Sequence, residues 1–332
     1  MEALRVGILG CGSWGPQICQ ALMESRQVKL VAAADLDLER AQAVAAAAGG
    51  AKALTDAEGL CRLSEVEAVI VAAPTPAHCA LTCMALQAGK HVLVEKPIAP
   101  TLAEAQTMLS AAEKAGRRLM VGQIMRFLPA AQEFRRRISA GDIGRPLHVI
   151  EQRYGAFRVH AWPDWWKKMD GFLLLHLGSH SVDMILWSLG RRAEWAFAQG
   201  MARKVDPTHG AIDTFSLTLG LEGEVLAGLH HEATGGAAHL AYHLLAVGES
   251  GRLELDEFTT VRLNGVEVFR QAEEPFQPAL RAEVDELASA VREDRQPSVS
   301  AVDVLPVVAC LDAARRSLHS RQMEAVACAS RA

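Results

Sequence analysis

The first third of the chain alternates short, nearly continuous apolar runs with alanine-rich stretches of helical length. Apolar runs without polar alternation are typical of strands that are buried on both faces of a sheet. The expected strands are residues 4–9, 28–34, 68–73, 91–95 and 118–122, and the expected helices are residues 14–25, 38–48, 77–88 and 102–115. This repeated strand–helix order predicts an α/β domain with a parallel, doubly wound sheet, the Rossmann architecture.

The pattern changes after residue 123. The expected elements there are helices over 129–139 and 173–189, strands over 147–154, 213–221, 224–232, 242–248 and 251–255, and closing helices over 279–293 and 301–319. Turn residues such as Glu222-Gly223 separate these strands, which favours an antiparallel sheet and an α+β class. We therefore expect a dinucleotide-binding domain over residues 1–123 and a second, α+β domain over residues 124–332.

Composition narrows the function classes. Half of the 332 residues are hydrophobic, and 34 basic against 39 acidic residues give a net charge of −5. This composition is that of a folded protein, and no basic stripe indicates a nucleic-acid partner. The N-terminal apolar segment is too short for a signal peptide, and no apolar run has the length of a membrane span, so we expect a cytoplasmic protein without a membrane partner. Seven cysteines without a CxxC spacing favour neither disulfides nor a zinc site, and we expect no metal.

A glycine-rich loop follows the first expected strand. Its sequence, Gly10-Cys11-Gly12-Ser13-Trp14-Gly15, allows a pyrophosphate to approach a helix N-terminus. Asp35 ends the second strand, about 20 residues further on, where a carboxylate binds ribose hydroxyls and repels a 2′-phosphate. The pair favours NAD, although Arg40 nearby leaves NADP open as a second cofactor. A glycine-rich turn without a ligand and a methyltransferase loop are the alternative interpretations.

Other strand ends carry polar residues to the same edge of the sheet. The segment Ala73-Pro74-Thr75-Pro76-Ala77-His78 follows the third strand, Glu95-Lys96-Pro97 ends the fourth, and Gln123 follows the fifth. Lys96 is either a surface cap of its strand or an ammonium that polarises a substrate oxygen during hydride transfer. The expected cofactor-binding residues are Gly10, Gly12, Ser13, Trp14, Gly15, Asp35, Pro74, Thr75, His78, Glu95, Lys96 and Gln123.

These motifs resemble the glucose-fructose oxidoreductase, inositol dehydrogenase and MocA (Gfo/Idh/MocA) family. The resemblance rests on the glycine loop, Asp35, the segments 74–78 and 95–97, and Gly178-Ser179-His180-Ser181-Val182-Asp183. It implies a C-terminal domain with an open, mainly antiparallel sheet that is used in oligomer contacts, and so a homodimer or homotetramer. It also implies oxidation or reduction of a sugar, a polyol or a similar hydroxylated ring, with Lys96 and His180 acting on the substrate hydroxyl.

The chain departs from this family at one position. The family commonly has an Asp four residues before the His, and here His176 stands at that place. On a helix, residues 176 and 180 share one face, so two imidazoles would lie together and would disfavour double protonation. His176 is then either a partner of His180 in proton exchange or only a packing residue.

Several further residues are weaker candidates for the substrate site. Trp162 and Trp165 either stack on a sugar face or anchor their own segment, and Arg126 either borders the substrate or forms a surface salt bridge. His230 and His231 adjoin on one expected strand and should point to opposite faces, which argues against a shared metal. The expected substrate residues are Lys96, Arg126, Trp162, Trp165, His176 and His180.

The sequence therefore predicts an NAD-dependent oxidoreductase that acts on a carbohydrate-like alcohol. The tyrosine–lysine pair of short-chain dehydrogenases is absent, because neither Tyr154 nor Tyr242 has a lysine four residues later. One alternative is a redox-neutral, glycoside-cleaving enzyme with tightly held NAD. The other is a dinucleotide-binding regulatory protein without turnover.

Overall fold

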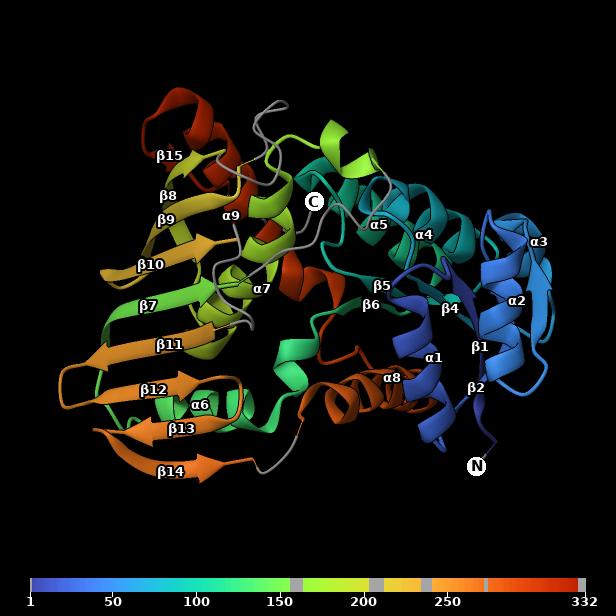
Figure 1. The fold of residues 1–332 in the computed structure, drawn as a ribbon, viewed down its shortest axis with the longest axis horizontal. Coiled ribbons are helices and arrows are strands. Elements are labelled where there is room, and N and C mark those ends of the chain that lie inside the picture. The colour runs from blue at the N-terminus through green and yellow to red at the C-terminus, as the bar shows by residue number, and fades with distance from the viewer. Residues whose placement is uncertain (1, 156–163, 203–211, 234–240, 272–273, 328–332) are drawn as a thin grey trace. The chain divides into compact units, whose positions relative to one another are not determined.

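The computed structural model describes residues 2–155, 164–202, 212–233, 241–271 and 274–327 (Figure 1). The chain divides into two compact units. Unit 1 comprises Met1–Phe127 and Phe276–Leu305, and unit 2 comprises Leu128–Pro275 and Pro306–Ala332. One expected substrate residue, Trp162, lies outside the described ranges.

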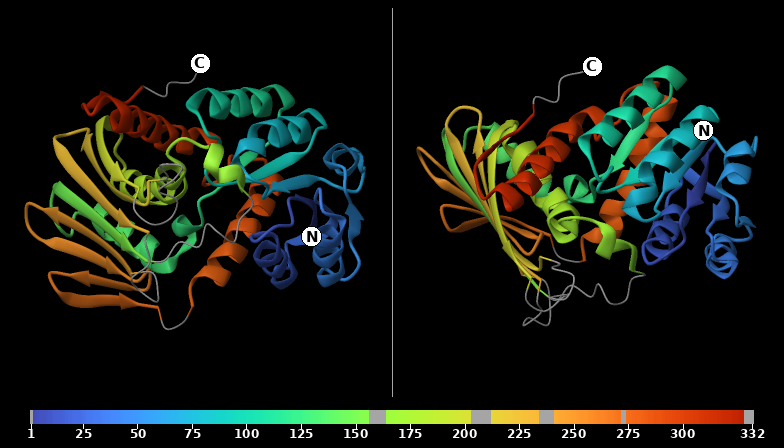
Figure 2. Two further views of the ribbon diagram at one scale, coloured as in Figure 1. Left: turned by 45° about the horizontal axis from the view of Figure 1, so that its top comes forward. Right: turned by 90° about the horizontal axis from the view of Figure 1, so that it is seen from above.

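Unit 1 contains a six-stranded sheet in the order β3-β2-β1-β4-β5-β6, in which every neighbouring pair is parallel. Helices cover both faces of this sheet (Figure 2). Its strands are β1 (Leu4–Leu9), β2 (Val28–Ala34), β3 (Lys52–Leu54), β4 (Ala68–Val71), β5 (His91–Glu95) and β6 (Leu119–Gly122). Its helical elements are α1 (Gly15–Glu24), α2 (Leu38–Ala47), α3 (Ala57–Arg62), η1 (Thr75–Ala77), α4 (His78–Gln87), α5 (Leu102–Ala115), η2 (Ile124–Phe127) and α8 (Phe276–Arg292). The predicted Rossmann architecture is confirmed.

Strand β3 and helix α3 have no counterpart among the expected elements. β3 has only three residues, none of them fully buried, so it lacks the apolar run that marks the other strands. α3 has six residues, and the carboxylate of its N-cap residue, Asp56, accepts hydrogen bonds from the main chain of Glu58 and Gly59. A three-residue edge strand and a six-residue helix are too short to show a periodic hydrophobic signal, and the helix depends on its local cap.

Helix α8 belongs to unit 1, although it lies far along the chain. The Arg292 guanidinium donates to the main-chain oxygens of Glu2 at 2.6 Å and Gln27 at 2.8 Å, and Ser289 donates to the Gln27 side chain at 3.3 Å. These bonds join α8 to the start of β1 and the segment before β2. The compact units therefore group residues 276–305 with the nucleotide-binding sheet, whereas the expected division at 123/124 placed them in the second domain.

Unit 2 contains a nine-stranded sheet in the order β14-β13-β12-β11-β7-β10-β9-β8-β15. β10 and β7 pair parallel, and the other neighbours pair antiparallel, so the predicted, mainly antiparallel sheet is confirmed. Its strands are β7 (Pro146–Tyr154), β8 (Ala193–Met201), β9 (Thr214–Leu221), β10 (Val225–Glu232), β11 (Ala241–Gly248), β12 (Arg252–Asp256), β13 (Thr260–Leu263), β14 (Val266–Arg270) and β15 (Glu324–Ala325). Its helical elements are α6 (Pro129–Ser139), η4 (Asp164–Lys168) and α7 (Phe172–Leu189), and α9 (Ala301–Ser320) continues into it from unit 1.

Helices α6 and α7 pack on one face of this sheet (Figure 2). The opposite face carries apolar side chains that are exposed or half-buried, because strand residues alternate between the two faces. Those side chains are Ile150, Tyr154, Trp195, Phe197, Met201, Leu226 and Leu245. In the described part of unit 2, this sheet is therefore open on one side.

α7 is the most apolar helix of unit 2 and lies in its core. Among the described residues it is the one helix long and apolar enough to cross a membrane, but 72% of that segment is buried inside the structure. Such burial is what a core helix of a folded domain shows. Two of its polar residues, Ser181 and Asp183, are also fully buried.

Candidate active site

The glycine loop connects β1 to α1 as the sequence predicts. Gly10 has φ +95°, and a Cβ there would meet the main chain of Ala72 and Ala73 at 2.6–2.7 Å, so only glycine fits. A Cβ on Gly12 would have no neighbour within 4 Å, which leaves open space above the loop. α1 begins at Gly15 without a side-chain cap, so no side chain caps the N–H groups of its first turn.

Asp35 follows β2 and faces this loop. One of its carboxylate oxygens accepts from the main-chain N of Cys11 at 2.7 Å, and the other accepts from the main-chain N of Asp37 at 2.9 Å. A carboxylate oxygen has further lone pairs, so both oxygens remain able to accept from ribose hydroxyls. Arg40 is half exposed and pairs with Asp37 at 3.3 Å rather than with Asp35.

Glu95 and Lys96 end β5 at the same edge of the sheet. The indole N–H of Trp14, in the glycine loop, donates to Glu95 at 2.7 Å, and the main-chain N of Lys96 donates to the other carboxylate oxygen at 3.2 Å. Burial raises the pKa of the Glu95 carboxyl to about 6, although the Lys96 charge and these hydrogen bonds favour its ionised form. Lys96 is half-buried, and its peptide bond to Pro97 is cis. The structure thus links the glycine loop directly to the residue next to Lys96.

Gln123 and Arg126 lie just beyond β6. Gln123 is 1% exposed, and among the described residues its side-chain oxygen and nitrogen have no hydrogen-bond partner. Arg126 is 8% exposed and therefore lies largely below the surface. A buried amide without a partner is costly in an apolar interior, so Gln123 is suited to bind a polar group of a ligand.

The residues of the segment after β4 differ from one another in exposure. Pro74 is exposed, while Thr75 and His78 are 3% and 1% exposed. His78 begins α4, and both of its ring nitrogens lie against main-chain carbonyl oxygens, those of Ala73 and Pro97. Its side chain therefore contacts the protein itself on both sides.

Glu283 on α8 is a residue of this region that the sequence analysis did not single out. Its carboxyl is fully buried, and within the described ranges neither oxygen has a hydrogen-bond partner. Burial and then the charge of Glu95 raise the pKa of Glu283 well above its ordinary value. The two carboxyls interact, so one of them holds a proton where isolated carboxyls would be ionised. The sequence does carry a signal that could have identified Glu283, because it is an acidic residue on the apolar face of an amphipathic helix.

In unit 2, α7 carries His176 and His180. Both are half-buried, and helical geometry places them on one face, as expected. The His176 ring packs on Phe172 with centroids 5.3 Å apart and planes inclined by 32°. His176 therefore contributes a packing contact with Phe172 on its own helix.

The tryptophans before α7 are only partly described. Trp162 lies outside the described residues. Trp165 is half-buried and meets Phe172 edge to face at a centroid distance of 5.4 Å, beside the buried Trp166 and Leu173. These contacts are those of a hydrophobic anchor, one of the two interpretations of Trp165.

A buried polar cluster fastens α7 to the sheet. The Ser181 hydroxyl donates to Glu151 at 2.7 Å and lies 3.0 Å from Nε2 of His231, which lies 2.7 Å from the other Glu151 oxygen. Burial opposes the charge of Glu151, but His231, Arg153 and the hydroxyl outweigh it and lower the pKa of Glu151. The opposite facing of His230 and His231 is confirmed, because His230 is exposed and bonds to Ser216.

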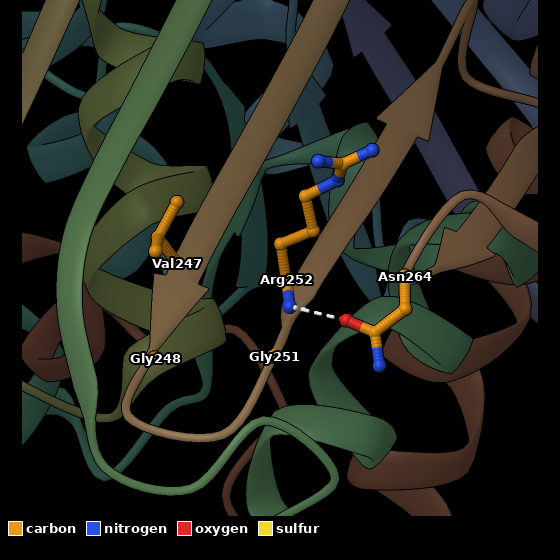
Figure 3. Close-up of a pocket in the computed structure, with 5 residues that line it drawn as sticks. All are labelled: Val247, Gly248, Gly251, Arg252 and Asn264. Carbon is orange, nitrogen blue, oxygen red and sulfur yellow. Dashed lines mark hydrogen bonds between the residues drawn. The ribbon is translucent and has the colours of Figure 1, made fainter.

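A shallow hollow in unit 2 lies apart from all of these residues (Figure 3). It is lined by Val247, Gly248, Gly251, Arg252 and Asn264, at two hairpin turns, and the Arg252 main-chain N donates to the Asn264 side chain at 2.9 Å. The residues that line it lie at turns, and two of them, Arg252 and Asn264, are hydrogen-bonded to each other. It contains none of the residues that the sequence pointed to.

The residues at the carboxyl edge of the unit 1 sheet fit a dinucleotide. The first turn of α1 lacks a side-chain cap and suits a pyrophosphate, Asp35 suits ribose hydroxyls, and the buried Gln123 amide suits a polar group. Among the described residues, no group of three His, Cys, Asp or Glu side chains is arranged to hold a metal.

Comparisons with known proteins agree with this geometry. The profile of an oxidoreductase family with an NAD-binding Rossmann fold matches residues 4–123, and that of the GFO/IDH/MocA C-terminal domain matches residues 131–254. Inositol 2-dehydrogenase 2 of Saccharopolyspora erythraea is 32% identical over 85% of this chain and 83% of its own length. A 4-carboxy-2-hydroxymuconate-6-semialdehyde dehydrogenase of Sphingobium sp. is 26% identical over 91% of this chain and 95% of its own. An oxidoreductase from Agrobacterium radiobacter, solved with NAD⁺, L-tartaric acid and magnesium, shares the fold with a TM-score of 0.88 at 19% identity, covering 98% and 99% of the two chains.

The fold, the site and these matches define an NAD-binding oxidoreductase. The chain belongs to the Gfo/Idh/MocA family, as the sequence motifs predicted. It is an NAD(P)-dependent dehydrogenase or reductase that acts on CH–OH groups, and its relatives include dehydrogenases of polyols and sugars.

Proposed function

We propose that this protein transfers a hydride between NAD and a hydroxyl or keto carbon of a sugar, polyol or glycoside. The observation that carries the proposal is the placement of Lys96 at the end of β5, beside a carboxylate that binds the glycine loop through Trp14. A cation at that edge of a doubly wound sheet is next to the region where the dinucleotide binds.

The proposed roles follow from charge development during the reaction. When bound, NAD supplies the group that accepts or returns the hydride. The Lys96 ammonium polarises the reacting oxygen, which gains alkoxide character as the alcohol is oxidised. His180 exchanges the hydroxyl proton, and His176 on the same face of α7 assists it. Arg126 and Trp165, with Trp162, are proposed to border the substrate.

The proposal also assigns separate roles to the two parts of the chain. Residues 1–123 bind the cofactor, with Pro74, Thr75, Gln123 and the glycine loop contacting it. Residues 124–332 serve substrate binding and oligomerisation. In support of this division, one matched profile covers residues 4–123 and the other covers residues 131–254.

We also propose that the protein is a cytoplasmic homo-oligomer. The open face of the nine-stranded sheet carries exposed Tyr154, Met201 and Leu226 together with half-buried aromatic residues. A second copy of the chain would remove this apolar surface from water. Sedimentation velocity tests this proposal: wild type sediments as a dimer or tetramer and Leu226→Arg as a smaller species. A monomeric wild type would contradict it.

The reaction itself is tested with purified protein, NAD and a panel of polyols, sugars and glycosides. Reduced nicotinamide that appears in step with a keto product supports the proposal, as does its consumption with the corresponding ketone. Cleavage of a glycoside with no net change in NAD would instead show the redox-neutral reaction. NAD binding without turnover on the whole panel would show a regulatory protein.

A further inference from the structure

His78 occupies an unusual position in unit 1. It is the first residue of α4 and is 1% exposed. Nδ1 of its ring lies 2.9 Å from the carbonyl oxygen of Pro97, and Nε2 lies 2.8 Å from the carbonyl oxygen of Ala73. One ring therefore joins the main chain that follows β4 to the main chain that follows β5.

Both neighbours of the ring are hydrogen-bond acceptors. A neutral imidazole has one N–H and donates to only one of the two carbonyls, whereas an imidazolium donates to both. Burial is the largest influence and lowers the pKa of His78; the Lys96 charge also lowers it, while the carbonyls of Ala73, Pro97 and Ile98 oppose the shift. The ring is therefore neutral near pH 7, and one carbonyl receives its proton.

We propose that His78 is a positioning residue for Lys96, which it holds through a hydrogen bond from Nδ1 to the carbonyl oxygen of Pro97. Pro97 directly follows Lys96, so this bond fixes the main chain from which the lysine side chain begins. The proposal rests on the proposed role of Lys96. It differs from the earlier expectation, in which His78 contacts the cofactor.

The position of the ring proton gives a test that needs no substrate. Nitrogen NMR of the histidine rings in wild-type protein, with His78 assigned by the spectrum of a His78→Asn variant, reports which nitrogen is protonated. We expect a neutral ring with its proton on Nδ1, the nitrogen that lies against Pro97. A proton on Nε2 alone would overturn the proposal, because the bond would then go to Ala73.

Two substitutions separate the two carbonyls in kinetic measurements. The amide nitrogen of Asn reaches the place of Nδ1, so His78→Asn keeps the bond to Pro97. That of Gln reaches the place of Nε2, so His78→Gln keeps only the bond to Ala73. Because small misplacements of reacting groups are costly, we expect His78→Gln to lower kcat by roughly ten- to a hundredfold with an unchanged Kd for NAD. We expect His78→Asn to stay near the wild-type kcat.

His91 provides the matched control. It begins β5, at the opposite end of the strand from Lys96, and its Nδ1 accepts from the main-chain N of Arg118 at 3.0 Å. His91→Ala also removes a half-buried imidazole and should leave kcat unchanged. Equal loss of kcat in the Asn, Gln and His91→Ala variants would show a general effect of lost stability and overturn the proposal.

Lys96→Ala distinguishes failure of this inference from failure of the proposed function. If Lys96→Ala turns over at the wild-type rate, the role of Lys96 is wrong and the positioning role falls with it. If Lys96→Ala is inactive while His78→Gln is as active as wild type, only the positioning role is wrong.

Discussion

We expect Asp35 to discriminate between the two nicotinamide cofactors. Its two oxygens already hold the main chain of Cys11 and Asp37, so the carboxylate is fixed beside the glycine loop. Hydrogen bonds from ribose hydroxyls to a charged group contribute about 1.5–3 kcal/mol, and a 2′-phosphate at the same place would be repelled. Its position makes a preference for NAD the expected result.

We predict that Asp35→Ser lowers the affinity for NAD about tenfold or more and raises the relative affinity for NADP. Titration of both cofactors into wild type and variant measures the two Kd values. Asp37→Ser is the control, since Asp37 is exposed and caps α2 through Glu39, a bond that serine can replace. A wild type that binds NADP at least as tightly as NAD would show that Asp35 does not contact the ribose.

The residues of the site differ in how far the sequence alone located them. Gly10, Asp35 and Lys96 follow apolar strands, so chain order and strand polarity were enough to bring them to one edge. Glu283 was missed because α8 lies far along the chain, and only folding places it near Glu95. The contacts of His78 with two carbonyls depend on loop geometry, which no spacing encodes. Glu151 did leave a signal, because it occupies an inward position of β7 between Val149 and Arg153.

Helix α7 is held by polar bonds inside an otherwise apolar core. Ser181 follows His180 directly and bonds to Glu151 and His231 on the sheet, which fixes the rotation of the helix about its axis. Since His176 lies one turn before His180, the same bonds determine where its ring lies. The imidazoles of α7 are thus placed by a buried network rather than by a loop.

Substitutions of His176 test whether two imidazoles take part in proton exchange. We predict that His176→Asp shifts the acid limb of the kcat/KM profile to higher pH, because an anion beside His180 favours its protonated form. We predict that His176→Ala lowers kcat/KM less than substitution of Lys96 or His180. The measurement is kcat/KM against pH for the wild type and both variants.

The control for these substitutions is His230→Ala, since His230 is an exposed histidine on β10 that bonds to Ser216. It should leave the profile unchanged. If both His176 variants keep full activity and an unchanged pH profile, His176 only packs on Phe172.

Elements with strong hydrophobic patterns were predicted well, and elements at the sheet edges were not. β1, β2 and β5 coincide with their expected ranges because each is a mostly buried and nearly continuous apolar run. β14 was not predicted separately, because its residues are exposed or half-buried and therefore lack alternation. The parallel pairing of β7 with β10 was also beyond the sequence, since the two strands lie far apart along the chain.

The stability of the protein should depend on pH through Glu283. Its folded pKa is raised, so between the ordinary carboxyl pKa and that raised value the folded state holds a proton that the unfolded chain has lost. Stability therefore falls as pH rises through this window. Each unit of pKa difference corresponds to about 1.4 kcal/mol.

We predict that Glu283→Gln is more stable than wild type at pH 8, and that the difference shrinks toward pH 5. Urea unfolding at both pH values measures it. Glu286, one turn later on α8, is the control of opposite sign: burial opposes its charge, but hydrogen bonds from Arg295 and Ser298 outweigh burial and lower its pKa. Glu286→Gln should be destabilising at pH 8 and less so in acid. A Glu283→Gln variant with no advantage at pH 8 would show that folding does not raise the pKa of Glu283.

In the proposed function, the whole chain works as an NAD-dependent dehydrogenase in which Lys96 acts on the substrate oxygen. Its control is Lys90, which lies before β5 and donates to the carbonyls of Leu63 at 2.8 Å and Val66 at 2.7 Å. Lys90→Ala loses structural hydrogen bonds and keeps the proposed chemistry.

The most direct measurement compares kcat and the Kd for NAD of wild type, Lys96→Ala and Lys90→Ala on the best substrate of the panel. We predict that Lys96→Ala lowers kcat by about 10²- to 10⁴-fold with the NAD affinity unchanged, and that Lys90→Ala keeps the wild-type kcat. A Lys96→Ala variant that forms reduced nicotinamide at the wild-type rate would contradict the proposed role of Lys96.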